Sequence, residues 1–455
     1  KIMSQKYDVV CTNPPYMGRR GMNSILTNYL KQYYNDSKND LFGVFIKGSL
    51  RMAKVSGYIS MITQQSFWFL AGFRSLRLDV FESTYTTNAC HLGLGAFGAD
   101  FGTVVFNLRK GKDINYLSKY LDLTTVKDIE DKLSLFLKSK RYDENTYLMP
   151  TNQLFKLPNS SVNYWVSGEI VEILEGKSLK DEFVSGGRNK THNDAKYIRF
   201  HWEIEYPSTR WVSYGKGGEY RKYYGNEYYV VDWSDEAKDF YLSNGGLCNE
   251  RFWNKEGITW SIVTSAEPSF RRKRSSMIYS SVSPTIFTQD LNIDLYVLGL
   301  LNSNVGRYFL NIISPTIGTN VGEVLNFPLI REKEQQVKKI VESCIFISKI
   351  DWDSFETSWD FKIHPLLKHL DLGENHKLSN IFTIWETETE EAFNQLKSNE
   401  EELNRIFIEI YGLEGELTPE VEDKDITISK ADRERDIKSF ISYAVGCMFG
   451  RYSLD

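Results

Sequence analysis

The stretch that decides the fold runs from Tyr7 to Tyr16 and reads YDVVCTNPPY. Its first six residues form an apolar run typical of a buried β-strand, and the run stops at Asn13-Pro14-Pro15-Tyr16. Two prolines in succession cannot continue a strand ladder, so a strand must end here and a loop must begin. In open α/β sheets, ligands bind at the carboxyl ends of the strands. The sequence therefore predicts a ligand-binding loop at this point.

Strand and helix patterns alternate after this loop. Residues 41–54 have helical spacing, residues 58–63 form a strand pattern, and residues 66–81 form an amphipathic helix pattern. Two further strand patterns follow, near residues 84–92 and at residues 101–108. This order predicts an α/β fold that ends in an antiparallel pair of strands.

Changes in composition and in the spacing of apolar residues divide the chain into four regions. Residues 1–112 are the α/β region, and residues 113–160 are polar and predict a connector of short helices. Residues 161–331 contain short aromatic strands broken by glycine, which predict an α+β domain. Residues 332–455 are charged and have helical periodicity.

Composition limits the class of protein. A chain of 455 residues with 41% hydrophobic and 25% charged residues is expected to form two to four soluble domains. The net charge of −5 excludes a chain that is basic all over, but a local basic cleft remains compatible with it. The five cysteines and six histidines lack the spacing of metal ligands, so no metal is expected. Without a signal peptide or an apolar run of membrane length, a cytoplasmic protein is expected.

The Asn-Pro-Pro-Tyr loop suits the chemistry of a planar exocyclic amine such as adenine N6. The nitrogen of such an amine is a poor nucleophile, because its lone pair is delocalised into the ring. The side-chain oxygen of Asn13 and the backbone carbonyl of Pro14 can accept its two N–H groups, and Tyr16 can stack on the ring. Pro15 helps to hold these acceptors rigid. The same loop geometry serves an RNA base or an amide, so these residues alone leave the substrate open.

Longer stretches resemble a known family. They read TNPPYMGR (12–19), SKNDLFGVFI (37–46), GYISMITQQSFW (57–68), WVSYGKGGEYRKY (211–223), GITWSIVT (257–264) and RERDIKSFISYAVGCMFGRYSLD (433–455). The first part of the chain is similar to the γ-group amino-methyltransferases. Nearly the whole chain resembles the PglX-type adenine-specific DNA methyltransferases of BREX phage-defence systems.

The resemblance implies a fold, a reaction and a set of site residues. Residues 1–112 are expected to be the C-terminal half of a Rossmann-like methyltransferase sheet. The implied reaction transfers a methyl group from S-adenosyl-L-methionine to the N6 of a flipped adenine. The Asn-Pro-Pro-Tyr loop would hold that adenine between Tyr16 and Phe97, and Phe45 would touch the adenine ring of the cofactor. The alternatives are helix packing for Phe45 and a turn in a glycine-rich hairpin for Phe97.

One departure from the family concerns the cofactor. The family's glycine loop for S-adenosyl-L-methionine precedes the Asn-Pro-Pro-Tyr strand, and only six residues do so here. The chain begins with Lys1 and looks like a piece of a longer protein. Gly93-x-Gly95-x-x-Gly98 imitates a glycine loop, but a strand follows it where the motif requires a helix. The chain alone is therefore expected to lack half of the cofactor pocket.

The region 161–331 matches the family's target-recognition region, which implies double-stranded DNA as a partner. Basic residues beside glycine and serine or threonine are the candidate phosphate contacts. They are Arg188, Lys190, Lys216, Arg221, Lys222, Arg271, Arg272, Lys273 and Arg274. The alternative for the run at 271–274 is an ordinary surface loop.

Two other functions remain open from the sequence. One is a truncated, non-catalytic module that binds DNA or partner proteins. The other is a methyltransferase that acts on RNA or on a protein glutamine. For the methyltransferase itself, the resemblance implies other BREX proteins as partners.

Overall fold

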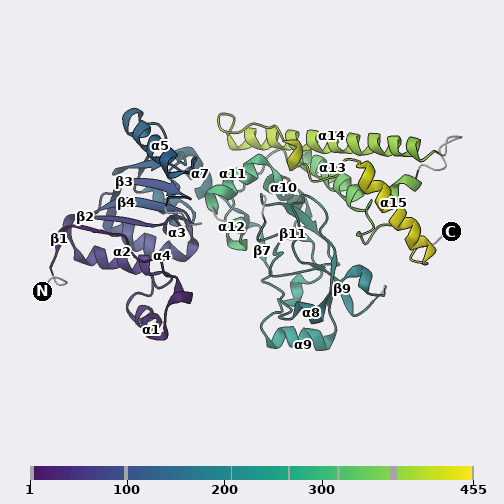
Figure 1. Ribbon diagram of the computed structural model, residues 1–455, viewed down its shortest axis with the longest axis horizontal. Helices are drawn as coiled ribbons and strands as arrows, with labels where there is room; N and C mark the ends of the chain where they lie inside the picture. The colour runs from purple at the N-terminus through teal and green to yellow at the C-terminus, as the bar shows by residue number, and fades with distance from the viewer. Residues whose placement is uncertain are drawn as a thin grey trace. The chain divides into compact units, whose positions relative to one another are not determined.

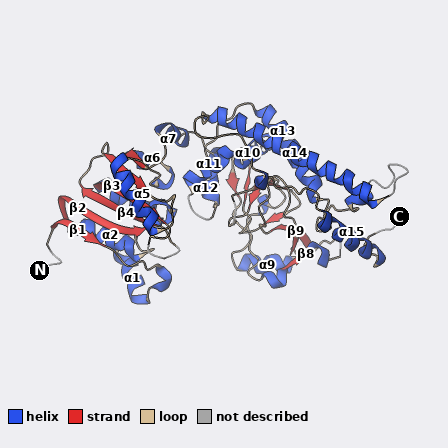
Figure 2. Cartoon of the chain, turned by 45° about the horizontal axis from the view of Figure 1, so that its top comes forward, coloured by secondary structure: helices blue, strands red, loops and turns tan. Residues whose placement is uncertain are grey.

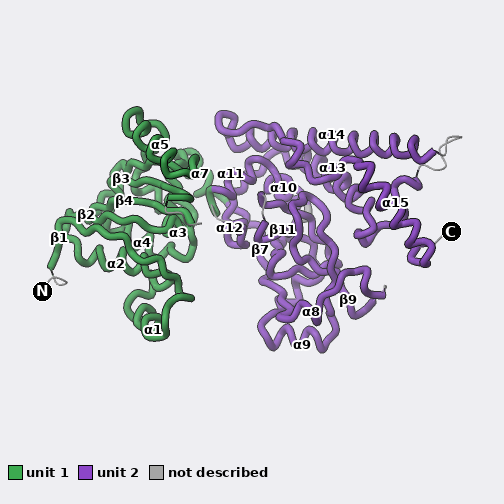
Figure 3. Tube along the Cα trace, viewed as in Figure 1, with its two compact units in different colours: residues 1–177, 312–316 green, residues 178–311, 317–455 purple. Residues whose placement is uncertain are grey.

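The computed structural model describes residues 5–96, 101–205, 208–264, 267–314, 318–368 and 377–452. The chain forms two compact units (Figure 3). Unit 1 comprises residues 1–177 with 312–316, and unit 2 comprises residues 178–311 with 317–455. Among the described residues, no helix has both the length and the apolar character needed to cross a membrane.

Unit 1 is built on a six-stranded mixed sheet with the order β1-β2-β4-β3-β5-β6 (Figure 1). The strands are β1 (Tyr7–Thr12), β2 (Ala53–Gln64), β3 (Thr84–Gly93), β4 (Thr103–Lys110), β5 (Leu117–Asp122) and β6 (Thr146–Pro150). β1 is parallel to β2, and β3 is parallel to β5. β4 lies between β2 and β3 and is antiparallel to both. The predicted α/β fold with an antiparallel pair is confirmed.

The burial of β1 differs from the prediction. Val9, in the middle of the strand, is 59% exposed. Within the described residues β1 pairs with β2 on one side only, so it forms an edge of the sheet. An apolar run indicates a strand, but it does not reveal how many neighbours that strand has.

The region 113–160, expected to be a connector, contributes β5 and β6 to this sheet, with α5 (Ile129–Tyr142) between them. In β5 the buried positions hold Ser118 and Tyr120, whereas the apolar Leu117 faces outward. Because an apolar residue is exposed and a serine is buried, β5 lacks the usual alternation of buried apolar and exposed polar residues, which hid the strand in the sequence.

The helices of unit 1 follow the strands in α/β order. They are α1 (Ser24–Tyr33), α2 (Leu41–Met52), α3 (Ser66–Phe69), α4 (Arg74–Ser83), α5, α6 (Gln153–Lys156) and α7 (Gly168–Glu175). α2 and α4 contact each other on one face of the sheet (Figure 1). α2 buries Phe42, Ile46 and Leu50, which recur every four residues on one side of the helix.

The helix predicted over residues 66–81 is broken at Leu70, whose backbone is extended. Buried Arg77 lies at the break, where its guanidinium donates to the carbonyls of Phe67 at 2.7 Å and Leu70 at 2.9 Å. It also donates to Asn159 and Ser160. Arg77 thus supplies hydrogen bonds to carbonyls before and at the break and to the segment at 159–160.

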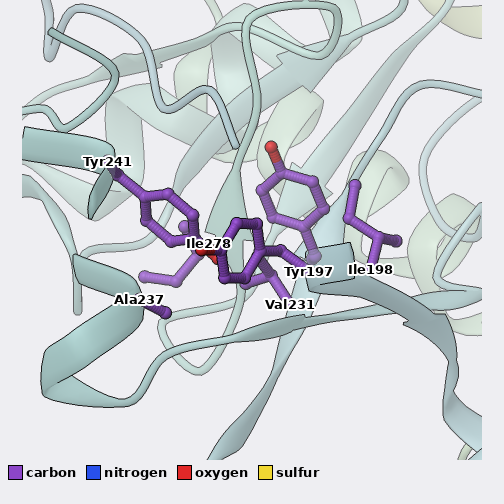
Figure 4. Packing of buried hydrophobic residues seen from close by; sticks show 7 residues of the cluster. Tyr197, Ile198, Val231, Ala237, Tyr241 and Ile278 are labelled. Atoms are coloured by element: carbon purple, nitrogen blue, oxygen red, sulfur yellow. The ribbon is translucent and has the colours of Figure 1, made fainter. Parts of the chain in front are cut away.

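Unit 2 contains two four-stranded sheets, ordered β13-β9-β10-β8 and β12-β11-β14-β7. The strands are β7 (Val184–Ser185), β8 (Ile198–Phe200), β9 (Trp211–Gly215), β10 (Tyr229–Asp232), β11 (Gly257–Trp260), β12 (Phe270–Lys273), β13 (Ile278–Tyr279) and β14 (Thr285–Phe287). The helices α8 (Asp194–Tyr197) and α9 (Asp235–Ser243) complete this part. Figure 4 shows its core, in which Tyr197, Val231, Tyr241 and Ile278 pack together.

The rest of unit 2 is mainly helical (Figure 2). Its helices are α10 (Leu291–Asn302), α11 (Asn304–Ile313, whose last two residues group with unit 1), α12 (Val321–Leu325), α13 (Glu334–Trp352), α14 (Leu378–Tyr411) and α15 (Arg433–Met448). α10, α13 and α14 pack on one another. The predicted helical C-terminal region is confirmed.

Candidate functional site

The Asn13–Tyr16 loop follows the carboxyl end of β1, and its predicted acceptor side chain, Asn13, is accessible to solvent. Asn13 and Pro15 are exposed, and Pro14 is buried. The hydroxyl of half-buried Tyr16 donates to the carbonyl oxygen of Ile62 in β2 at 3.2 Å, and burial raises the pKa of Tyr16. The loop is thus fixed to the neighbouring parallel strand, while the amide of Asn13 remains accessible.

Two phenylalanines hold the ring of Tyr16 by edge-to-face contacts. Phe42 of α2 lies 6.3 Å from Tyr16 between ring centroids, and Phe101 lies 5.5 Å away. Phe101 is 37% exposed and stands two residues before β4 begins. The predicted second stacking residue, Phe97, is outside the described residues. The sequence did not predict Phe101 for the site, because its contact with Tyr16 depends on the pairing of β4 with β2.

The chain after the loop is held by Asp40. One carboxylate oxygen of Asp40 accepts from the backbone N–H of Met17 at 3.0 Å and from that of Phe42 at 3.3 Å. The backbone N–H of Leu41 donates in return to the carbonyl of Met17 at 3.1 Å. Burial raises the pKa of Asp40, although these backbone donors act in the opposite direction. Asp40 therefore caps the N-terminus of α2 and also holds the backbone at Met17, directly after the loop.

Phe45 occupies the exposed side of α2. It is 41% exposed, whereas Phe42 and Ile46 on the same helix are fully buried. An exposed aromatic ring on the helix after the loop offers a flat apolar surface to a purine. Its contact with a cofactor remains a prediction.

The glycines at 93 and 95 serve a hairpin, as the sequence indicated. Gly93 is the last residue of β3 and Gly95 lies in the turn after it, before the antiparallel strand β4, and their φ angles are +64° and +85°. A Cβ atom at Gly95 would lie 2.3 Å from the carbonyl oxygen of Lys127, and one at Gly93 would lie 3.1 Å from Thr124. The glycines thus allow close packing on residues 124–127. The third glycine of the pattern, Gly98, is outside the described residues.

A buried histidine, His91, is connected through Gln65 to the backbone beside Phe101. His91 in β3 hydrogen-bonds through Nδ1 to the hydroxyl of Tyr164 and through Nε2 to Oε1 of Gln65, both at 3.0 Å. The backbone N–H of Gln65 donates to the carbonyl of Gly102, next to Phe101, at 2.9 Å. A neutral ring that donates from Nε2 and accepts at Nδ1 satisfies both partners.

The protonation of His91 predicts a loss of stability in acid. Burial lowers the pKa of His91 from 6.5 to about 4, so the unfolded state binds the proton more tightly. This contribution is complete above pH 6.5 and is lost as the pH falls toward 4, by about 3 kcal/mol at most. Urea unfolding followed across this range should show the decline, and His91→Gln should flatten it. An equal pH dependence in the variant and the parent would contradict this assignment.

Three of the predicted DNA contacts are buried in unit 2. The ammonium of Lys222 pairs with Glu400 at 2.7 Å, and both side chains are under 10% exposed. Arg271 donates to the backbone carbonyl of Arg221 at 3.1 Å, and fully buried Lys273 donates to the carbonyl of Arg274 at 3.0 Å. In β12 the side chains alternate between faces, so the basic run does not form one surface. Lys222, Arg271 and Lys273 therefore lie in the interior of unit 2 and not on a surface that phosphate can reach.

Four others are engaged with carboxylates. The ion pairs are Lys216–Asp194 (2.9 Å), Arg221–Asp351, Arg272–Glu256 (2.8 Å) and Arg274–Glu227. By contrast, Arg188 and Lys190 are exposed and form no ion pair with a described residue. These two remain the most available of the predicted phosphate contacts in unit 2.

Residues 1–97, which carry the Asn-Pro-Pro-Tyr loop and the first strands of the sheet, match the model of the Eco57I restriction-modification methylase family. Along its whole length the chain is similar to adenine-specific methyltransferases of the PglX type, which is the resemblance that the sequence predicted. Adenine-specific methyltransferase PglX of Lacticaseibacillus casei (strain Zhang) is 36% identical over 487 residues, which cover 100% of this chain and 40% of the relative.

A second relative, adenine-specific methyltransferase BrxX of Escherichia coli O9:H4 (strain HS), is 28% identical over 483 residues, which cover 100% of this chain and 39% of the relative. The chain therefore spans about two fifths of the length of these relatives. The solved structure of the Type IIL restriction-modification enzyme MmeI in complex with DNA matches with a TM-score of 0.53 at 11% identity, over 96% of this chain and 57% of that one. This likeness shows the fold alone.

Proposed function

We propose that the chain is part of a site-specific DNA adenine-N6 methyltransferase. The observation that carries the proposal is the exposed amide of Asn13 at the carboxyl end of a parallel strand, beside a Tyr16 that is anchored to that strand's neighbour. The adenine-specific names of both relatives support the choice of base.

The chain's own residues would activate the amino group by accepting hydrogen bonds. The side-chain oxygen of Asn13 and the carbonyl of Pro14 would accept one N–H each, which shifts the nitrogen toward tetrahedral geometry and localises its lone pair. Tyr16 would stack on the extruded base, a contact worth roughly 1–3 kcal/mol. Alignment then contributes most of the rate, because the methyl donor is already electrophilic.

S-adenosyl-L-methionine, when bound, supplies an electrophilic methyl group on a positively charged sulfur. Of the described residues, Phe45 offers an exposed ring that fits the purine of this cofactor. The Gly93–Gly95 turn does not fit it, because Thr124 and Lys127 fill the space beside these glycines. The fit is therefore partial, and we assign to this chain the adenine-binding half of the site.

Unit 2 would recognise the DNA site, with Arg188 and Lys190 as phosphate contacts. Cytoplasmic phage defence of the BREX type, in the company of other proteins of that system, is the biological setting that the PglX and BrxX relatives favour. A target made of RNA or a protein glutamine is the alternative for the same loop.

The proposal is tested by sequencing that detects modified adenines in the source genome, with and without the gene. We expect N6-methyladenine at one short sequence motif in the presence of the gene and its loss on deletion. Unchanged adenine modification, together with methylation of RNA or protein by the gene product, would favour the alternative substrates.

A further inference from the structure

The segment between Tyr16 and α2 leaves the sheet and returns to the same point. The backbone of Gly18 forms an antiparallel bridge with Asp40, and the N–H of Arg19 donates to the carbonyl of Asn39 at 3.3 Å. The side chain of Asn39 in turn donates to the carbonyl of Gly72 at 3.0 Å. Residues 17–40, which we call the α1 excursion, are thus closed at their base directly beside the Asn-Pro-Pro-Tyr loop.

The helix of this excursion contributes little to the core. α1 projects away from the sheet (Figure 1), and Leu30 is its one buried residue. Its exposed side carries Ile25, Tyr29 and Tyr33, which recur every four residues and are 81%, 51% and 55% exposed. The rings of Tyr29 and Tyr33 lie 4.8 Å apart between centroids. Adjacent exposed apolar side chains of this kind do not stabilise the core and are typical of a surface that binds another molecule.

The exposed charges between the loop and the end of α1 are all basic, whereas the carboxylate of Asp40 at the base of the excursion is buried. Residues 9–35 contain Arg19, Arg20 and Lys31 and no aspartate or glutamate, in a chain whose net charge is −5. All three basic side chains are exposed and form no ion pair with a described residue. Most of the basic residues predicted to bind DNA in unit 2, by contrast, are paired or buried.

We propose that the α1 excursion is a DNA-contact surface of the catalytic unit. Arg19 and Arg20 bind phosphates that flank the extruded adenine, since they follow Tyr16 by three and four residues on a backbone fixed at both ends. The tyrosine face of α1 lies against the sugars and bases of the same flank. Positive charge interleaved with tyrosine fits nucleic acid, whereas a protein partner for an apolar helix face does not require unpaired arginines. The inference rests on the proposed function, because it takes duplex DNA as the substrate.

The test measures binding of a short fluorescent DNA duplex as a function of salt concentration. Each phosphate contact contributes about 0.9 to the slope of log K against log salt concentration. Arg19→Ala/Arg20→Ala should therefore reduce the magnitude of the slope by about 1.8, and Arg19→Lys/Arg20→Lys should retain the parent slope. The control is Lys112→Ala, which removes one exposed charge just past the far end of β4 and should change the slope by less than about 0.3. Equal circular-dichroism melting of all variants shows that the fold is kept.

The outcomes distinguish a failure of this inference from a failure of the proposed function. Binding by the parent with an unchanged slope in Arg19→Ala/Arg20→Ala would overturn the inference and leave the proposed function standing. That result would favour a protein partner for the exposed face of α1. Absence of duplex binding by the parent would overturn the proposed role of this chain in DNA recognition, and the inference with it. A drop in slope in the Lys112→Ala control as large as in the double variant would show a general charge effect and would also refute it.

Discussion

Asn13→Ala is expected to abolish adenine modification in cells that carry the variant gene while leaving DNA binding intact. The substitution removes one of the two proposed acceptors for the amino group and leaves the backbone of the loop in place. Loss of a single preorganised hydrogen bond to a reacting group lowers kcat by about 100- to 1000-fold. Because Asn13 is exposed and has no packing role in the described structure, the free energy of unfolding should change by less than about 0.5 kcal/mol. Modified adenines are counted by sequencing, and duplex affinity is measured by fluorescence titration.

Asn115→Ala serves as the matched control for this experiment. Asn115 is also exposed and lies in the turn after β4, at the opposite end of the sheet. It accepts one long hydrogen bond of 3.4 Å from Asn152, so its replacement should affect neither modification nor binding. If Asn13→Ala lost DNA binding while remaining folded, the proposed division between holding the adenine and binding the duplex would be wrong. Retained modification in Asn13→Ala would remove the proposed acceptor role.

The fold of unit 1 was largely predictable because local signals agreed with the tertiary structure. The double proline ended a strand, and the helix after it has both its cap at Asp40 and its apolar face in the sequence. Features set by distant contacts were not predictable. The break at Leu70 lies against Arg77, which comes from the next helix, and the strand at 117–122 exposes Leu117 and buries Ser118.

The candidate site was predictable where the chemistry lies within one loop. Asn13 and Tyr16 lie at the end of their strand, where the sequence placed them. Phe101 was missed because its contact with Tyr16 joins two segments that are 85 residues apart in the sequence. The basic residues at 271–274 were predicted to contact phosphate, although Arg271 and Lys273 are buried in β12 and only Arg272 of that strand is exposed. Charge in a sequence therefore indicates a nucleic-acid contact only after its internal partners are known.

The ion pair of Lys222 and Glu400 links the segment before β10 to α14 inside unit 2. The two side chains are 8% and 3% exposed, and the Nζ–Oε2 distance is 2.7 Å. The second carboxylate oxygen of Glu400 is buried without a hydrogen-bond partner among the described residues. Burial raises the pKa of Glu400, and Lys222 opposes that shift. Burial also acts to lower the pKa of Lys222, but Glu400 outweighs it and the net shift is upward. The carboxylate therefore depends on a single cation.

Lys222→Met is expected to lower the free energy of unfolding by about 3–5 kcal/mol at pH 7, because it leaves an uncompensated buried carboxylate. The loss should shrink as the pH falls. Without Lys222 the pKa of Glu400 in the folded state lies still further above its unfolded value, so protonation restores stability at low pH and the deficit grows as the pH rises through that pKa. Lys222→Met/Glu400→Gln should recover most of the loss, and Lys238→Met, which removes the partner of exposed Asp235, should cost less than about 1 kcal/mol. Urea unfolding of the four proteins measures these differences. A small effect of Lys222→Met that is independent of pH would mean that Glu400 finds another partner or water, and that the pair does not hold α14 against the strands of unit 2.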